Sequence, residues 1–300
     1  MTVRTAFGPD SGIGFIGLGS MGAGMAHCLL RNGFRLRVFA RDPKACNPFV
    51  EAGAQATASP AELARSCKLV FLSLPDAAAV EDVLFGPEGL SQALEPGSYV
   101  VDTSTIAATS ARDFGRRLAQ YDIALLDAPV SGGQQGALAG TLTCMVGGAT
   151  PVVEACREVI STFCKTVTHV GELGAGQTVK LCNQVAVAGA MLGVADAIAL
   201  AQSQAQGVDM AAMREVLMGG SAKSFSLEKH APRIIARDFK PGFRAALMRK
   251  DLRLALDMAH ATSTVLPCAT VAHQLLDELC AGGGSDLDWC AVAVQANKPA

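Results

Sequence analysis

Residues 12–26 read GIGFIGLGSMGAGMA, an apolar run followed directly by regularly spaced glycines and then by a helix-compatible segment. The run predicts a short buried strand, and the glycines at 17, 19 and 22 give the pattern G-x-G-x-x-G. In that pattern the first glycine permits a tight turn, the second lets the backbone approach a pyrophosphate, and the third lets helix and strand pack closely. Free N–H groups at the helix start also favour a phosphate. The stretch therefore predicts a dinucleotide site with contacts from Gly17, Leu18, Gly19, Ser20, Met21 and Gly22.

The sequence around this stretch fits a doubly wound parallel sheet. A helix is expected over 20–32, and a second strand over 35–39 follows the glycines by about 20 residues, as a βαβ unit requires. Short apolar runs between helical segments predict further strands at 69–74, 99–102, 124–127, 142–146 and 167–169. Such alternation is typical of an α/β fold of the Rossmann type. Ligands bind at the carboxyl ends of such strands, so functional residues are expected there.

The character of the chain changes after Gly176, because alanine, leucine and methionine then recur at helical spacing. We expect two domains: residues 1–173 form the dinucleotide-binding domain, and residues 174–300 form an all-helical domain for substrate binding and oligomerisation. A long helix over 177–206 is expected to join them. Its apolar part, 185–201, is interrupted by Asp196, which predicts a helix buried on all sides rather than a membrane span. Small and apolar residues around this helix predict a homodimer or homotetramer.

Composition excludes several classes of function. The net charge of −2 and the pI near 6.2 give no electrostatic basis for binding nucleic acid or an acidic membrane surface. The ten cysteines form no CxxC pair and the five histidines form no HExxH motif, so we expect no metal site. Unpaired cysteines in apolar runs indicate a reducing compartment. With no apolar run ahead of the first strand to act as a secretory signal, we expect a cytoplasmic protein.

The residues after the second strand bear on the choice of cofactor. An acidic residue at this point would bind the ribose 2′-hydroxyl of NAD and repel the 2′-phosphate of NADP. Here Ala40 stands in that position, and Arg41 offers a guanidinium suited to phosphate. We therefore expect NADP to be favoured over NAD. The alternative is that Asp42 binds the ribose one position later and that Arg41 is an ordinary solvated residue.

Four blocks in order resemble the β-hydroxyacid dehydrogenase family, and together they span almost the whole chain: GFIGLGSMG at 14–22, DAPVSGG at 127–133, GAGQTVKLCNQ at 174–184 and FKPGFRAALMRKDLRLALD at 239–257. The resemblance implies an NAD(P)-dependent oxidoreductase that interconverts a small β-hydroxy acid and its semialdehyde by hydride transfer. The last two blocks resemble most the branch that reduces tartronate semialdehyde to glycerate. Specificity for 3-hydroxyisobutyrate, L-threonate or succinic semialdehyde stays open, as does a non-catalytic dinucleotide-binding protein.

The residues and the resemblance agree on a catalytic lysine. Reducing an aldehyde needs a proton donor beside the carbonyl oxygen, while the nicotinamide carries the hydride. Lys180 is the titratable group of an otherwise apolar and amide-rich helix segment, and the resemblance assigns it the role of general acid and base. Asn183 and Gln184 follow by three and four residues, so either can present an amide to the substrate from the same side of the helix.

Further site residues come from the ends of the expected strands. Ser131, Gly132 and Gly133 combine a hydroxyl with backbone N–H groups and are expected to bind the carboxylate of a small substrate. The resemblance implies the same role for them. It also implies cofactor contacts from Leu74, Pro75 and Thr105 and, in the C-terminal domain, from Lys250.

Overall fold

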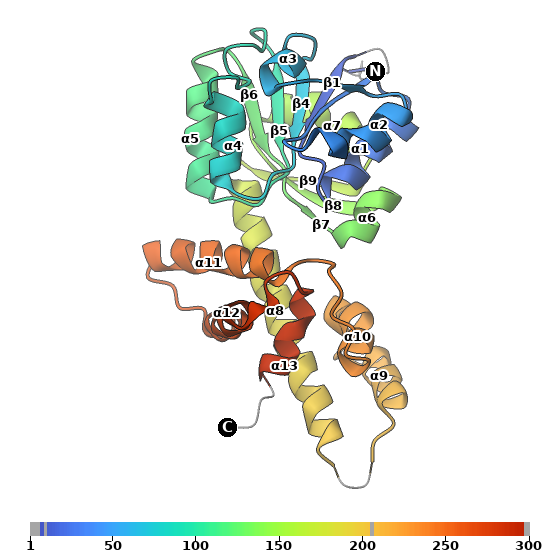
Figure 1. Cartoon of the computed structure of the whole chain (residues 1–300). Coiled ribbons are helices and arrows are strands. Elements are labelled where there is room, and N and C mark those ends of the chain that lie inside the picture. Colours follow the sequence, from blue (N-terminus) through green and yellow to red (C-terminus); the bar gives the residue numbers. More distant parts are fainter. Residues whose placement is uncertain (1–6, 9–10, 205–206, 297–300) are drawn as a thin grey trace, which may run out of the picture. The chain divides into compact units, whose positions relative to one another are not determined.

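The chain forms two compact units in a computed structural model, which describes residues 7–8, 11–204 and 207–296. The first unit is Met1–Lys180 and the second is Leu181–Ala300 (Figure 1). The sequence places the domain boundary before residue 174, whereas the contacts divide the chain after Lys180, because helix α8 (Ala175–Gln202) begins in the first unit and continues into the second. Residues 1–6, which bear on the expected lack of a secretory signal, lie outside the described residues.

The first unit contains a nine-stranded sheet in the order β3-β2-β1-β4-β5-β6-β8-β7, with β9 paired to β8. Every strand expected from the sequence is present, and the α/β Rossmann class is confirmed. Two strands of two residues each, β3 and β7, were too short to be expected, and β8 runs antiparallel to β6 and β7. The strands are β1 (Ile13–Ile16), β2 (Leu36–Phe39), β3 (Gln55–Ala56), β4 (Leu69–Leu72), β5 (Tyr99–Asp102), β6 (Ala124–Asp127), β7 (Val130–Ser131), β8 (Leu142–Gly147) and β9 (Cys164–Gly171).

Helices cover both faces of this sheet, so its central strands are largely apolar, and β5 and β6 end in Asp102 and Asp127. In β4, Leu69 and Phe71 pack into one core cluster together with residues of α1, α2 and α7. Val70 and Leu72 pack into another cluster together with residues of α3, α4 and α5. The bounds of these helices are α1 (Gly22–Arg31), η1 (Pro43–Cys46), α2 (Asn47–Glu51), α3 (Pro60–Ala64), α4 (Ala77–Phe85), α5 (Ala108–Ala119), α6 (Gly133–Ala139) and α7 (Thr150–Ile160).

The register of the parallel strands aligns their carboxyl ends. Ile16 of β1 pairs with Leu72 of β4, Leu72 pairs with Asp102 of β5, and Asp102 pairs with Asp127 of β6. The loops that leave these four strands therefore start at one edge of the sheet. These loops, and the short segments that follow them, contain the site residues that the sequence predicts between residues 17 and 133. The exceptions are Ala40 and Arg41, which follow β2.

The second unit is helical, as expected, in the part of the chain that the structure describes. A core of buried side chains from α8, α11, α12 and the last helices holds it together. Its elements are α9 (Met210–Gly219), η2 (Ser226–His230), α10 (Ala231–Ile235), α11 (Ala245–Ala261), α12 (Pro267–Leu279), η3 (Cys280–Gly284), η4 (Trp289–Ala291) and α13 (Val292–Ala296).

Helix α8 differs from its expected form in two respects. It has 28 residues and contains a window of mean hydropathy 1.7, so length and composition alone would let it cross a membrane, contrary to the sequence-based expectation. One such helix is weak evidence of a span, because long core helices share these features. The expectation of burial on all sides is also wrong, because one third of that window is buried and Asp196 lies exposed within the helix. Apolar composition does not show which faces are covered.

The ten cysteines are all free thiols. Only Cys182 and Cys268 are exposed, and the other eight are buried. Burial raises the pKa of Cys67 to about 11 and that of Cys156 to about 12. The buried thiols therefore behave as small apolar side chains, as the sequence suggested.

Asp288 organises the end of the second unit. Its carboxylate is 1% exposed, and its two oxygens accept the backbone N–H groups of Cys290 at 3.0 Å and Phe243 at 3.1 Å. The Arg233 guanidinium pairs with the same carboxylate at 2.9 Å. The His230, Asp288 and Cys290 ligand atoms lie within 4.8 Å of one another, a spacing that could hold a metal. The carboxylate is already engaged by three donors, so a structural role accounts for it.

We expect Asp288→Ala to lower the free energy of unfolding of the second unit by about 2–4 kcal/mol, because it removes the acceptor of two N–H groups and the ion-pair partner of the half-buried Arg233. Trp289 is the chain's single tryptophan and is 3% exposed, so its fluorescence during urea unfolding measures this unit. The matched control is Asp286→Ala, which removes a carboxylate that is 80% exposed. It should change stability by less than about 0.5 kcal/mol, and equal losses for both variants would contradict the role of Asp288.

Candidate active site

The glycine loop has the geometry that a dinucleotide requires. Gly17 has a φ of +97°, and a Cβ at this position would overlap the carbonyl oxygen of Ser73. A Cβ at Gly22 would overlap the carbonyl oxygen of Gly17, so the helix start packs directly on the turn. A Cβ at Gly19 would meet no atom within 4 Å, so the backbone there is open to a ligand. Gly17 and Gly22 thus meet the conditions of the turn and of the close packing that the pattern predicts, and the backbone at Gly19 is open where the pattern predicts a phosphate.

The end of β2 carries the residues that bear on cofactor choice. Ala40 is half-buried directly after the strand, and Arg41 is exposed beside it. Asp42 caps η1, because its Oδ1 accepts the backbone N–H of Lys44 at 3.0 Å. One carboxylate oxygen of Asp42 is therefore committed to the chain's own backbone. Lys44 adds a second cation, also exposed, to this turn, and sequence reasoning did not single it out.

The segment expected to bind a carboxylate lies between β7 and α6. Ser131 ends β7, where it pairs with Thr143 of β8, and its side chain is half-buried. Gly132 and Gly133 have φ values of +137° and +67° and are exposed. Two successive residues with positive φ turn the backbone sharply at the start of α6, and a pair of backbone N–H groups in such a turn can face an anion.

Lys180 lies in the second turn of α8 and is 8% exposed. The first turn of this helix is held by Asp127, the last residue of β6. The two carboxylate oxygens of Asp127 accept the backbone N–H groups of Gly174 and Gln177, each at 2.7 Å. Burial raises the pKa of Asp127 from 3.8 to about 6, although the two N–H groups and the charge of Arg112 act in the opposite direction.

The two amides that follow Lys180 are hydrogen-bonded to each other. Asn183 donates its Nδ2 to the Oε1 of Gln184 at 2.9 Å, and Gln184 donates its Nε2 to Asp251 of α11 at 2.7 Å. Gln184 is buried, whereas Asn183 is half-buried. Asp251 also pairs with the ammonium of Lys250 at 3.1 Å. The orientation of the Gln184 amide is therefore fixed by a buried carboxylate.

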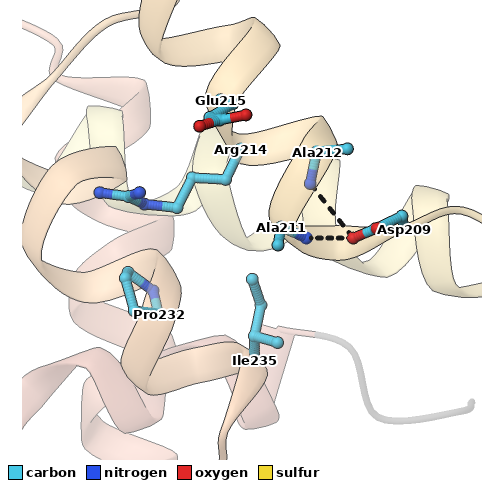
Figure 2. Close-up of a pocket in the computed structure, with 7 residues that line it drawn as sticks. All are labelled: Asp209, Ala211, Ala212, Arg214, Glu215, Pro232 and Ile235. Carbon is cyan, nitrogen blue, oxygen red and sulfur yellow. Dashed lines mark hydrogen bonds between the residues drawn. The ribbon is translucent and has the colours of Figure 1, made fainter.

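A separate pocket of about 550 Å³ lies in the second unit and contains none of the predicted site residues (Figure 2). Figure 2 shows Asp209 accepting the backbone N–H groups of Ala211 and Ala212 at the start of α9. Arg214 donates to the carbonyl oxygens of Leu227 and Glu228. Asp209 and Arg214 thus serve the local fold.

Sequence reasoning missed three polar residues that support the predicted ones. These are Asp127, Gln177 and Asp251, which are respectively 0%, 0% and 2% exposed. Asp127 and Gln177 stand inside blocks that were singled out for neighbouring residues, and Asp251 follows Lys250. The available signal was an acidic residue or an amide within an apolar strand or helix, since such a group is buried only with hydrogen-bond partners.

Comparison with known proteins assigns the fold to a class of enzyme. Residues 12–171 match the family model described as the NAD binding domain of 6-phosphogluconate dehydrogenase. Residues 174–295 match the one described as NAD-binding of NADP-dependent 3-hydroxyisobutyrate dehydrogenase. A dinucleotide-binding unit followed by this helical unit defines a nicotinamide-dependent oxidoreductase.

Relatives along the full length give the family. The chain is 40% identical over 284 residues to the 2-hydroxy-3-oxopropionate reductase from Escherichia coli (strain K12), covering 95% of this chain and 96% of that one. It is 38% identical to the NAD-dependent L-serine dehydrogenase from Pseudomonas aeruginosa, with coverages of 93% and 96%. The chain belongs to the β-hydroxyacid dehydrogenase family and is an NAD(P)-dependent enzyme of that family.

Solved structures agree. The 3-hydroxyisobutyrate dehydrogenase from Mycobacterium tuberculosis, determined with L-serine, matches with a TM-score of 0.85 and 31% identity over 96% of this chain and 100% of that one. The structure of Psf3 in complex with NADP+ and 2-OPP matches with a TM-score of 0.86 and 29% identity, covering 94% of this chain and 99% of that one. Both likenesses extend over the two units.

We expect the buried charge of Asp127 to lower stability as the pH rises. Between about pH 4 and 6 the folded chain holds a proton that the unfolded chain has released, so the free energy of unfolding falls through this window and the cost stays constant above it. The step from 3.8 to about 6 corresponds to about 3 kcal/mol. The measurement is the free energy of unfolding in urea, followed by circular dichroism, for wild type and for Asp127→Asn. The value for wild type minus the value for the variant should fall by about this amount from pH 4 to 7. A pH-independent difference would contradict the raised pKa.

Proposed function

We propose that this enzyme reduces tartronate semialdehyde, which is 2-hydroxy-3-oxopropionate, to glycerate with NADPH as the hydride donor. The observation that carries the proposal is the full-length identity with the 2-hydroxy-3-oxopropionate reductase, which exceeds the identity with the L-serine dehydrogenase. The substrate is a three-carbon acid with a carboxylate, a hydroxyl and an aldehyde. Each of these groups requires a different partner from the protein.

We assign these partners to residues whose local geometry supports the role. Ser131, Gly132 and Gly133 bind the carboxylate through a hydroxyl and backbone N–H groups. The amide pair of Asn183 and Gln184 binds the substrate hydroxyl, supported by the fixed orientation of Gln184 against Asp251. Because a site built to hydrogen-bond a hydroxyl disfavours substrates that lack it, this pair selects against succinic semialdehyde.

Lys180 is the proton donor to the aldehyde oxygen. The glycine loop together with Leu74, Pro75, Thr105 and Lys250 would hold NADPH, which would supply the hydride when bound. As hydride reaches the carbonyl carbon, the oxygen gains negative charge, and an ammonium at that oxygen neutralises it by transferring a proton. In the oxidation direction the neutral amine accepts the proton from the hydroxyl.

We expect Lys180→Ala to lower kcat for aldehyde reduction by about 10²–10⁴, the range of general acid–base catalysis, with the Kd for NADPH little changed. The assay follows nicotinamide absorbance at saturating cofactor. Lys165→Ala, which removes an exposed lysine from β9, is the matched control and should keep wild-type turnover. Near wild-type turnover in Lys180→Ala would remove Lys180 from the mechanism, and no turnover in wild type with any substrate would favour a non-catalytic dinucleotide-binding protein.

A substrate panel tests the specificity. In wild type, kcat/KM for tartronate semialdehyde should be at least about tenfold higher than kcat/KM for the reduction of succinic semialdehyde. It should exceed by the same factor kcat/KM for the oxidation of 3-hydroxyisobutyrate, L-threonate or L-serine. A tenfold difference corresponds to about 1.4 kcal/mol, which is about the contribution of one hydrogen bond. Preference for L-serine would overturn the substrate while leaving the reaction class intact.

NADP is the preferred cofactor in this proposal. Ala40 places no carboxylate against a 2′-phosphate, Arg41 offers a planar set of donors, and Asp42 already caps η1. Lys44 extends the positive charge of this turn.

Replacing Ala40 with Asp and Arg41 with Ser should shift the ratio of kcat/KM for NADPH to that for NADH by at least about tenfold, or 1.4 kcal/mol, toward NADH. The shift follows from adding a repulsive carboxylate and removing a charge-assisted contact. Arg65→Ser, at an exposed arginine after α3, is the control and should leave the ratio unchanged. A wild type that strongly prefers NADH would show that Ala40 and Arg41 do not set the choice.

We further propose that the enzyme is a cytoplasmic homodimer or homotetramer that takes a small carboxylate substrate and binds neither nucleic acid nor membrane. The limited burial of the apolar window of α8 supports an assembly, since a second copy would cover it. The free thiols support a reducing compartment. Light scattering coupled to size-exclusion chromatography distinguishes monomer, dimer and tetramer.

A further inference from the structure

Asp127 and the start of α8 form one side of a buried hydrogen-bond network in the first unit. The first N–H groups of a helix have no partner within the helix. Here two backbone N–H groups at the start of α8, those of Gly174 and Gln177, donate to separate oxygens of one carboxylate, so the carboxylate grips the first turn at two points. A Cβ on Gly176 would lie 2.8 Å from Asp127 Oδ2 and 2.5 Å from the carbonyl oxygen of Met145, so this turn lies directly against β6 and β8.

The side chain of Gln177 forms the other side of the network. It is fully buried, its Oε1 accepts the backbone N–H of Ile106 at 3.1 Å, and its Nε2 donates to the carbonyl oxygen of Ser104 at 2.8 Å. Both ends of the amide are thus bound to the segment that follows β5. A shorter or apolar side chain could not hold this segment at two atoms.

The same segment is tied to the loop after β4. Ser104 Oγ accepts the backbone N–H of Leu74 at 2.8 Å, and the backbone N–H of Ser104 donates to Asp102 at 2.9 Å. Leu74 and Thr105 are residues to which the proposed function gives cofactor contacts. A continuous set of hydrogen bonds therefore joins the proposed cofactor loops to the first turn of α8.

Lys180 follows Gln177 by three residues, which is about 4.5 Å along the helix axis and nearly one turn. Fixing Gln177 therefore fixes the backbone from which the Lys180 side chain extends. A proton donor must lie within hydrogen-bond reach of the reacting oxygen, and a misplacement of about 1 Å can cost about a hundredfold in rate.

We propose that Asp127 and Gln177 are positioning residues for the reaction, which hold the first turn of α8 against the 104–106 segment so that Lys180 is fixed relative to the cofactor loops. This inference rests on the proposed role of Lys180 as proton donor. The burial of a carboxylate supports it, since the ionised form of Asp127 is costly in this environment and an exposed capping residue would start the helix at lower cost.

The test compares Gln177→Met, which keeps the length of the side chain and removes both hydrogen bonds, with Thr178→Val. Thr178 lies in the same turn, but its hydroxyl donates to the carbonyl oxygen of Gly174 within the same helix segment and, among the described residues, bonds to no other element. Gln177→Met should lower kcat for tartronate semialdehyde about 10- to 100-fold with a change in KM of less than about threefold. Thr178→Val should stay within about twofold of wild type. Asp127→Asn, in which one oxygen becomes a donor facing an N–H group, is the second variant and should behave like Gln177→Met.

The solvent deuterium isotope effect on kcat separates positioning from structural damage. A misplaced proton donor makes proton transfer more rate-limiting, so the isotope effect should rise in Gln177→Met, whereas loss of folded molecules lowers the number of NADPH-binding sites and leaves the isotope effect unchanged. A kcat per NADPH-binding site within about twofold of wild type in both variants overturns the inference, as does a loss of kcat with an unchanged isotope effect.

The variant Lys180→Ala, measured in the same assay, separates this inference from the proposed function. If Gln177 acts through Lys180, the double variant Lys180→Ala/Gln177→Met should be no slower than Lys180→Ala within about twofold. Full additivity of the two losses overturns the inference while the role of Lys180 stands. Wild-type turnover in Lys180→Ala overturns the proposed role of Lys180, whatever Gln177→Met does.

Discussion

A carboxylate without access to water accepts the N–H groups that start a 28-residue helix, and the arrangement of the proposed catalytic residues depends on it. Among the residues that the structure describes, Asp127 is the side chain that accepts two N–H groups at the beginning of this helix. The carboxylate in turn is placed by β6, whose pairing with β5 sets Asp127 opposite Asp102. Strand register in the sheet is thereby transmitted to the helix that carries Lys180. Burial of apolar side chains on both faces of the sheet offsets the unfavourable free energy of burying this carboxylate.

Much of this fold could be predicted from the sequence, because its strands are buried on both faces and stand out as short apolar runs between helices. The glycine loop was predictable for a physical reason, since Gly17 and Gly22 each meet a steric condition that the position imposes. The strands β3 and β7 were not, because two residues carry no periodicity. The antiparallel direction of β8 was not predictable either, since an apolar run has no direction.

In the candidate site, the chemically reactive residue was easier to find than the residues that hold it. Lys180 is conspicuous as a charge on an apolar helix, whereas Asp127 and Gln177 become meaningful only when the loop after β5 and the start of α8 are brought together in space. Their partners are backbone atoms, which leave no trace in the side-chain sequence. Asn183 and Gln184 are a similar case, because the two amides differ in burial and in the contact of Gln184 with Asp251, neither of which the sequence shows.

The distribution of thiols allows chemical labelling to measure the unfolding of each unit. Six buried cysteines lie in the first unit and two in the second, namely Cys28, Cys46, Cys67, Cys144, Cys156, Cys164, Cys280 and Cys290. Cys182 and Cys268 are exposed to reagents in the folded state. A maleimide added to the native protein thus labels two sites, one of them two residues beyond Lys180. Mass spectrometry of further labelling then counts how many molecules have exposed each unit, since a buried thiol reacts only after its surroundings come apart.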